Sequence, residues 1–492
     1  MPRAGWVKPT DDQRLSDHVA LGVLTSTFPP ELVDQVVRAS GRGEQWHRLL
    51  PARLVVYYVL APALFAAADY VEVMRHLVEG LSRESGWRQQ WTVPSQPAIS
   101  QARPDTLGAF YRDWRLTAID GTTLDVADSV ENAAEFGRPG SVRGERSAFP
   151  QLRLVALAEA GTRAVTGVAL GPYRTGEPTL ARAFLPGIGP GTLVLADRGF
   201  TAQPLFTAAA ETGADLCWRA QSNAVLPVRE RFADGSYRSE IVASDDKRTR
   251  ARVTSVRVIE YTVDDPGRPG AEDHRDRLLT TIADPTAAPA PELAALYPEH
   301  WRAETTLDEM KTHQRGPRLL LRSRTPEGVR QEVYGYLCTH YAIRSLMATA
   351  ASDRGGDPDP TSFTRALPAA RRGVRAGLGA AHQALAAALP ATRADIGGGL
   401  LPRRRLRAAP RVVARPMSTY GVKRPEPRAW PQPTRRPADA VRTVSRQYLM
   451  GGGLTWCLHP RSSPSATRDN SEFTPSRRGV VAGAGGFEPP IT

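Results

Sequence analysis

The chain has 492 residues, more than one hydrophobic core normally organises, so two or three domains are expected. Hydrophobic residues make up 41% and charged residues 23% of it, which is the composition of a folded globular protein rather than of a disordered one. The three cysteines, Cys217, Cys338 and Cys457, are far apart, which argues against a disulfide framework or a cysteine-built zinc site and favours a reducing, cytoplasmic location.

The net charge of +13 is concentrated in one segment of the sequence. Residues 361–450 contain 18 Lys and Arg against 3 Asp and Glu, whereas residues 1–360 contain 42 against 45. A block of positive charge attracts phosphate backbones because its binding releases counterions. This segment therefore indicates contact with DNA, and a solvated basic tail is the alternative.

The N-terminal region, residues 1–110, is predicted to be a helical domain. FPPELVDQVV has prolines where a helix begins and then apolar residues at helical spacing. Leu54 to Ala68 is the most apolar stretch, but it has 15 residues, and a membrane-spanning helix needs about 20. We therefore expect a buried helix there and no membrane segment. The domain is either a packing unit or a DNA-recognition unit.

Residues 114–221 predict a mixed sheet. Three consecutive strands are expected in WRLTAIDGTTLDV, QLRLVALAEAG and AVTGVALGPY, with turn residues between them. A helix, a strand, a second helix and a last strand follow in PTLARAFLPGI, TLVLADRGF, PLFTAAAETG and ADLCWRAQ. Hairpin-connected strands followed by right-handed crossovers give an α/β fold whose order matches the ribonuclease H-like fold.

The remaining segments complete the domain plan. Residues 222–290 are strand-rich and are predicted to be an insertion into the catalytic domain, which spans 111–352 and ends in helices. GGDPDP at 355–360 is expected to be a linker, and residues 353–450 form the basic C-terminal region. Residues 451–492 have few apolar side chains and are expected to be disordered.

Two aspartates lie at informative places in the predicted sheet. Asp120 lies within the first strand and Asp197 ends the fourth, and these two strands are neighbours in the expected order. Two close carboxylates repel unless a cation lies between them, and hard oxygen ligands suit Mg²⁺ or Mn²⁺. Either aspartate alone is more simply a turn or capping residue.

A third acidic residue, Glu304, lies in a predicted helix, YPEHWRAETTLDEMKTHQRG. Tyr297, Glu304 and Lys311 are seven residues apart and His300 lies four before Glu304, so an α-helix would place them on one face. The alternative is a solvated helix face with an ordinary Glu–Lys pair.

The two aspartates and this helix together resemble the DDE transposases of the insertion-sequence four family. That family places its first Asp in a strand followed by Gly, as in AIDGT, and its second in a strand end similar to LADRGF. Its Glu helix carries Tyr, Glu and Lys at the spacing of Tyr297, Glu304 and Lys311, and His300 stands where the family has Arg. The resemblance covers about residues 15–445, including the strand-rich insertion.

The resemblance implies a DNA transposase that cleaves the ends of an insertion sequence and joins them to target DNA. Asp120, Asp197 and Glu304 would be the catalytic residues and would hold two Mg²⁺ or Mn²⁺ ions. Contacts to DNA phosphates are expected from five residues: Tyr297, His300, Lys311, Arg315 and Arg318.

The expected partner is double-stranded DNA, at both the element's ends and the target, bound by a homodimer in the cytoplasm at the nucleoid. Two alternatives stay open at this level: a catalytically impaired DNA-binding remnant of a transposase, motivated by His300, and a ribonuclease H-like nuclease that cleaves without strand transfer. A glycosidase with paired carboxylates would not explain the basic segment or the position of Lys311.

Overall fold

A computed structural model of the chain describes the parts that build the sheet and most of the helices around it. The described residues are 23–40, 52–65, 110–140, 147–243, 253–263, 275–316, 320–356, 358–377, 382–401, 412–413, 421–422 and 440–444. Within the basic C-terminal region, residues 402–439 lie outside them apart from 412–413 and 421–422, and so do the residues after 444 and Arg318.

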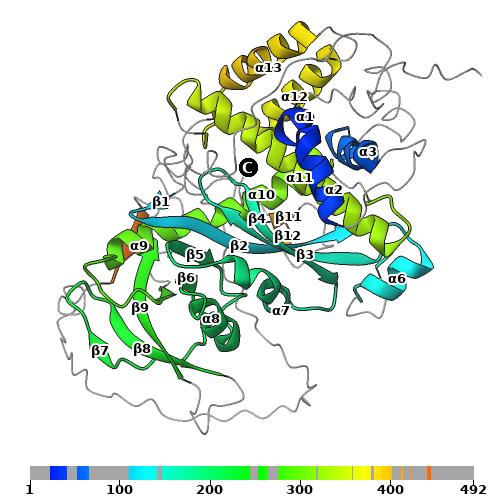
Figure 1. The fold of residues 1–492 in the computed structure, drawn as a ribbon. Coiled ribbons are helices and arrows are strands. Elements are labelled where there is room, and N and C mark those ends of the chain that lie inside the picture. The colour runs from blue at the N-terminus through cyan, green and yellow to red at the C-terminus, as the bar shows by residue number, and fades with distance from the viewer. Residues whose placement is uncertain are drawn as a thin grey trace, which may run out of the picture.

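A large mixed sheet forms the centre of the molecule (Figure 1). Its first five strands stand in the order β4-β3-β2-β5-β6, with β2 antiparallel to β3 and parallel to β5, as the sequence predicted for a ribonuclease H-like fold. Their bounds are β2 Trp114–Asp125, β3 Gln151–Glu159, β4 Val165–Pro172, β5 Thr192–Ala196 and β6 Asp215–Arg219. A short strand, β1 (Phe110–Tyr111), pairs with the start of β2.

The predicted insertion is strand-rich, and its strands continue the same sheet from β6 in the order β10-β9-β8-β7. Their bounds are β7 Glu230–Arg231, β8 Tyr237–Val242, β9 Val253–Val263 and β10 Asp276–Thr280. One strand of the C-terminal region, β13 (Val441–Thr443), returns to pair with β9. A separate pair, β11 (Val412–Val413) and β12 (Gly421–Val422), lies outside this sheet.

Helices cover both faces of the sheet (Figure 1). One face packs against α7 (Glu177–Ala181), the 3₁₀ turn η2 (Arg182–Gly187) and α8 (Gln203–Ala210). The other packs against α9 (Ala290–Leu296), the 3₁₀ turn η3 (Tyr297–His300), α10 (Trp301–Asp308), the π-helical segment η4 (Glu309–Gln314) and the first half of α11 (Pro326–Ser352). A short helix, α6 (Val130–Phe136), follows β2.

The N-terminal helices share one hydrophobic core with helices from the C-terminal part of the chain. These helices are α1 (Val23–Thr27), α2 (Pro30–Ala39), α3 (Ala52–Leu64), α12 (Phe363–Gly377) and α13 (His382–Gly397). The second half of α11 runs through the middle of this core. Buried residues of α3 such as Tyr57 and Leu64 pack there, as expected for the apolar stretch. Among the described residues, no helix is long and apolar enough to span a bilayer.

Candidate active site

Asp120 lies in the middle of β2, on the sheet face that α9, α10 and α11 cover. Side chains alternate between the faces of a strand, and Leu116, Ala118 and Leu124 of β2 all pack on that face. Asp120 has the same parity and therefore points the same way. The backbone N–H of Gly121 donates to its Oδ1 at 2.8 Å.

Asp197 follows β5 directly and extends the same alternation. Leu193 and Leu195 pack on the face of Asp120, so the residue after Ala196 is directed to that face as well. Ile119 pairs with Ala196 in the parallel register, which places the two aspartates side by side at the carboxyl end of β5. The turn is fixed by the N–H of Gly199, which donates to Oδ1 of Asp197 at 2.7 Å.

Glu304 reaches this site from α10, which lies across β2 and β3. Burial raises the pKa of Asp120 well above its usual range, and the nearby negative charges of Glu304 and Asp197 raise it further. The three carboxyl groups, distant in sequence, are therefore close enough to act on one another.

The donor set fits a divalent cation. Three carboxylates near one partly buried sheet face offer hard oxygen ligands, and burial together with the neighbouring negative charges raises the pKa of Asp120. In the described part of the chain, no three His, Cys, Asp or Glu side chains already surround a single point as metal ligands. The carboxylates are thus near one another without being closed around an ion position.

A fourth carboxylate, Glu177 at the start of α7, lies behind the site on the opposite sheet face. A Cβ atom at Gly121 would lie 2.6 Å from its Cδ, so glycine is what allows this close approach. Arg153 donates to Oε1 of Glu177 at 3.2 Å. Burial raises the pKa of Glu177, and the charge of Asp197 adds to this effect. Sequence reasoning missed Glu177, because a glutamate in the first turn of a helix is ordinary.

Gly121→Ala is expected to destabilise the protein, since the added methyl group would force the carboxyl group of Glu177 away from Arg153. Because Glu177 is a flexible, 31% exposed side chain that can move aside, the cost is mainly the loss of its pair with Arg153, about 0–1 kcal/mol. The free energy of unfolding, measured by urea denaturation, should fall by that amount. The double variant Gly121→Ala/Glu177→Ala should lose no more than Glu177→Ala alone, because the clash disappears. A larger loss in the double variant would contradict this packing.

Tyr297 and His300 lie in η3 and are both buried. Tyr297 is 3% exposed and its hydroxyl donates to the carbonyl of Ala196 at 3.3 Å, next to Asp197. Its ring stacks on that of His300 at 4.3 Å, and Nδ1 of His300 bonds the Tyr297 carbonyl at 2.8 Å. The solvated helix face considered as the alternative is therefore wrong for these two residues. They pack against the strand end that carries Asp197.

The burial of His300 predicts a pH dependence of stability. Burial lowers its pKa from 6.5 to about 4, so within this range the unfolded chain binds the proton more readily than the folded one. Its contribution is complete above pH 6.5 and is lost as the pH falls towards 4, on the order of 3 kcal/mol in total. His300→Phe should flatten the stability curve in this window, measured by urea denaturation. Equal slopes for wild type and variant would contradict this.

Lys311 lies beside the site, in η4. Its Nζ donates to Oγ1 of Thr122 at 3.2 Å, and Thr122 is two residues past Asp120 on the same sheet face. Burial, and then the charge of Arg315, lower the pKa of Lys311. Arg315 is 6% exposed, and its Nε and Nη1 have no hydrogen-bond partner among the described residues. Arg318 cannot be placed, because it lies outside the described residues.

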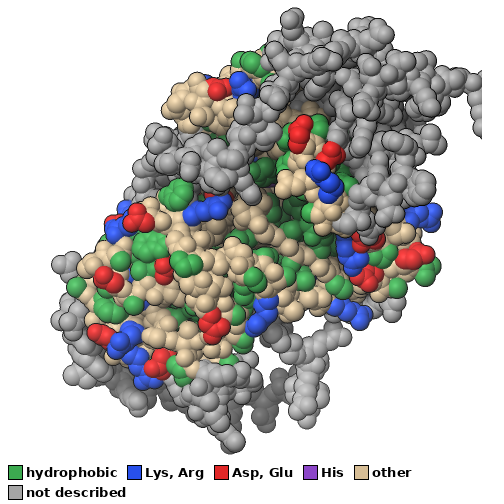
Figure 2. All heavy atoms as spheres, viewed as in Figure 1, with side chains coloured by type: hydrophobic (Ala, Val, Ile, Leu, Met, Phe, Trp, Pro, Cys, Tyr) green, Lys and Arg blue, Asp and Glu red, His purple; other side chains and the backbone are tan. Residues whose placement is uncertain are grey.

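Acidic and basic side chains are interspersed on the described part of the face in Figure 2, without a large patch of either sign. This agrees with the near balance of charge in residues 1–360. Of the 18 Lys and Arg residues in the basic segment 361–450, 11 lie between 402 and 439, where only two short strands are described. The described surface drawn in Figure 2 is therefore not a broad positive one.

Known proteins resemble this chain over most of its length. It is 27% identical over 422 residues to the transposase InsG for insertion sequence element IS4 of Escherichia coli, with 78% of this chain and 90% of that protein covered. A cryo-EM structure of a piggyBac transposase synaptic complex with hairpin DNA aligns with a TM-score of 0.39 and 12% identity, covering 80% of this chain and 87% of that one.

Two family descriptions match consecutive parts of the sequence. Residues 18–110 match the insertion element 4 transposase N-terminal family, and residues 112–341 match the transposase DDE domain. The second match contains β2, β5 and α10, and so all three converging carboxylates. The chain belongs to the insertion-sequence four family of DDE transposases, which use divalent metal ions to cleave DNA and transfer its strands.

Proposed function

We propose that Asp120, Asp197 and Glu304 are the catalytic carboxylates of this transposase and that together they hold two divalent ions, Mg²⁺ or Mn²⁺. The observation that carries the proposal is the parallel register of β2 with β5, which places Asp120 beside Asp197 on the sheet face that α10, the helix of Glu304, covers. All three positions lie within the match to the transposase DDE domain, and Asp120 and Asp197 are directed to the sheet face that α10 covers.

Such ions, when bound, lower the pKa of an attacking water or DNA 3′-hydroxyl and stabilise the leaving 3′-oxygen. The chain's own contribution is to fix the three carboxylates on a rigid sheet and helix. Oδ1 of Asp120 accepts from the N–H of Gly121 and Oδ1 of Asp197 from that of Gly199, which fixes both carboxyl groups on the sheet. Removal of the ions by a chelator should stop cleavage and leave the fold intact.

Lys311 and Arg315 are proposed to bind DNA phosphates near the scissile bond. The ammonium group of Lys311 lies next to β2, close to Asp120. Arg315 has two buried guanidinium nitrogens without a described partner, and they could donate to a phosphate oxygen once DNA binding uncovers the side chain, which is 6% exposed here. Arg318 remains proposed from the sequence alone. Phosphate contacts of this kind position the DNA without reading its sequence.

For Tyr297 and His300 the burial favours a packing role beside Asp197. Direct contact of either ring with DNA, as expected from the family, would require the ring to become uncovered when DNA binds. DNA recognition by the N-terminal helices is also a proposal. Their shared core with α11, α12 and α13 makes these helices part of one helical unit.

The oligomeric state and location are proposed from the reaction. Strand transfer requires two element ends in one complex, so we propose a homodimer assembled on DNA, acting in the cytoplasm at the nucleoid. Sedimentation of the protein with and without DNA ends would measure the stoichiometry. One protein copy per pair of ends would contradict the dimer.

The experiment that tests the function uses the purified full chain, a DNA duplex carrying the ends of its element, and Mg²⁺ or Mn²⁺. Metal-dependent nicking at the ends followed by joining to target DNA is expected. Binding without cleavage would identify an impaired remnant instead. Cleavage without any joined product would identify a nuclease.

A further inference from the structure

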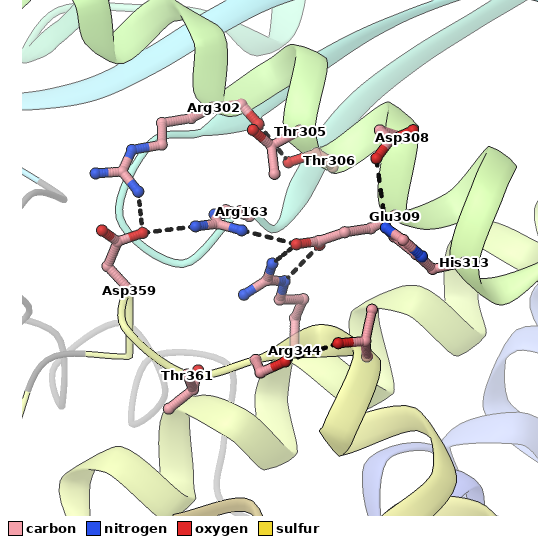
Figure 3. Close-up of polar contacts among 12 residues, drawn as sticks. Arg163, Arg302, Thr305, Thr306, Asp308, Glu309, His313, Arg344, Asp359 and Thr361 are labelled. Carbon is pink, nitrogen blue, oxygen red and sulfur yellow. Dashed lines mark hydrogen bonds and ion pairs between the residues drawn. The ribbon is translucent and has the colours of Figure 1, made fainter. Parts of the chain in front are cut away.

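A buried network of charged side chains, separate from the three carboxylates, binds the helical run η3–α10–η4 (Tyr297–Gln314), which carries Glu304. Its centre is Glu309, 4% exposed, which accepts from Nη1 of Arg163 at 2.7 Å and from Nε of Arg344 at 2.9 Å. Nε2 of His340 lies 3.1 Å from the second oxygen of Glu309. Figure 3 shows Glu309 held between the two arginines. Phe363 of α12 stacks on His340 and lies under the guanidinium of Arg344, which closes the cluster.

A second branch returns to the same helical run upstream of Glu304. Oδ1 of Asp359 pairs with Nη2 of Arg163 at 2.6 Å and also with Nη1 of Arg302 (Figure 3). Nε of Arg302 in turn bonds Glu299 at 2.6 Å. The network therefore holds the run at residues 299, 302 and 309, on both sides of Glu304.

The charges of this network balance. Its members are three carboxylates and three guanidinium groups: Glu299, Asp359, Glu309, Arg163, Arg302 and Arg344. Burial lowers the pKa of His340, which leaves its imidazole neutral at neutral pH. Burial alone would raise the pKa of Glu309, but Arg344 and Arg163 hold it well below the usual range. Loss of the Glu309 charge leaves the buried guanidinium groups of Arg163 and Arg344 without this partner.

The anchored side of the helix is not the catalytic side. At about 100° per residue, Glu309 lies about 140° around the axis from Glu304, towards α11. Glu309 is also the first residue of the π-helical segment that carries Lys311, and π-helical turns are frequent at functional sites. Glu309, the residue through which the network anchors this helix, thus lies two residues before Lys311 and five residues after Glu304.

The anchor connects this helix to the strands that carry the aspartates. Arg163 lies in the turn after β3, the neighbour of Asp120's strand β2. Its φ is +59°, a left-handed conformation that is unfavourable for a residue other than glycine. The N–H of Arg163 donates to the carbonyl of Glu159 at 2.9 Å, and its guanidinium contacts both Glu309 and Asp359. Strained conformations persist where the surroundings hold them firmly.

We propose that Glu309 is a positioning residue, which through Arg163 and Arg344 holds Glu304 and Lys311 against the sheet in the geometry that metal binding and cleavage require. The inference rests on the proposed function, since it takes Glu304 as a metal ligand. Glu309 itself lies on the far side of the helix and does not touch the reacting atoms.

The test is the dependence of single-turnover DNA-end cleavage on Mn²⁺ and Mg²⁺ concentration. Glu309→Gln keeps the shape and removes the charge. It should raise the metal concentration for half-maximal cleavage by about 10- to 100-fold while binding of the DNA ends is unchanged. Asp359→Asn removes the charge that pairs with both Arg163 and Arg302, but leaves the contacts of Glu309 in place. Because Asp359 is more exposed than Glu309, this variant should give a smaller shift in the same direction.

Asp234→Asn is the matched control, because Asp234 pairs with Arg257, a buried arginine of the strand-rich insertion. It should lower stability without moving the metal dependence. The proposal is overturned if folded Glu309→Gln or folded Asp359→Asn shows the wild-type metal dependence, or if Asp234→Asn shifts it equally. If Glu309→Gln does not fold, the metal dependence of cleavage by Asp359→Asn decides whether the proposal holds. Cleavage by Glu304→Gln in the same assay would instead refute the assignment of Glu304.

Discussion

Asp120→Asn, Asp197→Asn and Glu304→Gln are each expected to reduce DNA-end cleavage by about 1000-fold or more while binding of the DNA ends is kept. Each change removes one charged metal ligand, and metal ions supply several kcal/mol of transition-state stabilisation, where each 1.36 kcal/mol is tenfold in rate. Burial and, after it, the charges of Glu304 and Asp197 raise the pKa of Asp120, so neutralising one of the three carboxyl groups removes an unfavourable charge and folding should not suffer. Single-turnover cleavage and a DNA-binding titration measure the two effects.

Asp215→Asn provides a control for these variants. Asp215 is the first residue of β6 and pairs with Leu193 near the start of β5, whereas Asp197 follows the end of β5. The carboxylate of Asp215 accepts from Nε1 of Trp114 at 2.6 Å. It should therefore keep wild-type cleavage. Retained cleavage in Asp120→Asn, Asp197→Asn or Glu304→Gln would remove that residue from the catalytic set.

Glu309→Ala is expected to lower the free energy of unfolding by about 3–5 kcal/mol, because it leaves Arg163 and Arg344 buried without a carboxylate partner. This is a large part of the stability of an ordinary domain. The loss should be seen in urea denaturation at neutral pH. Since the pKa of Glu309 is lowered in the folded state, its contribution is present above the ordinary glutamate pKa and declines as the pH falls below it.

Asp395→Ala serves as the comparison. The pair of Asp395 with Arg372 is exposed on both sides, at 41% and 62%, and such pairs contribute about 0–1 kcal/mol. A Glu309→Ala midpoint no lower than that of Asp395→Ala would contradict the account of the buried network.

The central sheet could be predicted because its strands are short, apolar and consecutive in sequence. The hairpins and crossovers of β2 to β6 follow from local turn residues and from the handedness of crossovers. The two aspartates could be placed for the same reason. Each lies in or directly after a strand whose neighbour in the sheet could be predicted. The register of Ile119 with Ala196 bears out their adjacency.

The extension of the sheet could not be predicted from the sequence. Strand-rich residues between 222 and 290 indicate an insertion, but their pairing with β6 depends on contacts across the sheet edge. The return of β13 to β9 joins residues almost 180 positions apart, as Val441 with Val263 shows. Such long-range pairings leave no periodic signal in the chain.

The helix of Glu304 was predicted only in outline. Spacing of seven residues placed Tyr297, Glu304 and Lys311 on one face of a regular α-helix, but the run passes from 3₁₀ to α to π geometry. Tyr297 is buried as a result, and Lys311 remains near β2. The charge network around Glu309 could not be predicted from the sequence either. Arg163 and Arg344 come from elements distant in the chain, and a single charged residue is usually solvated.

Anomalous scattering from crystals of the protein bound to DNA ends and soaked in Mn²⁺ tests the three-carboxylate site most directly. We expect an anomalous peak with oxygen ligands from Asp120, Asp197 and Glu304, and no peak at that place in Glu304→Gln. A manganese position that uses the two aspartates while Glu304 points elsewhere would contradict the account.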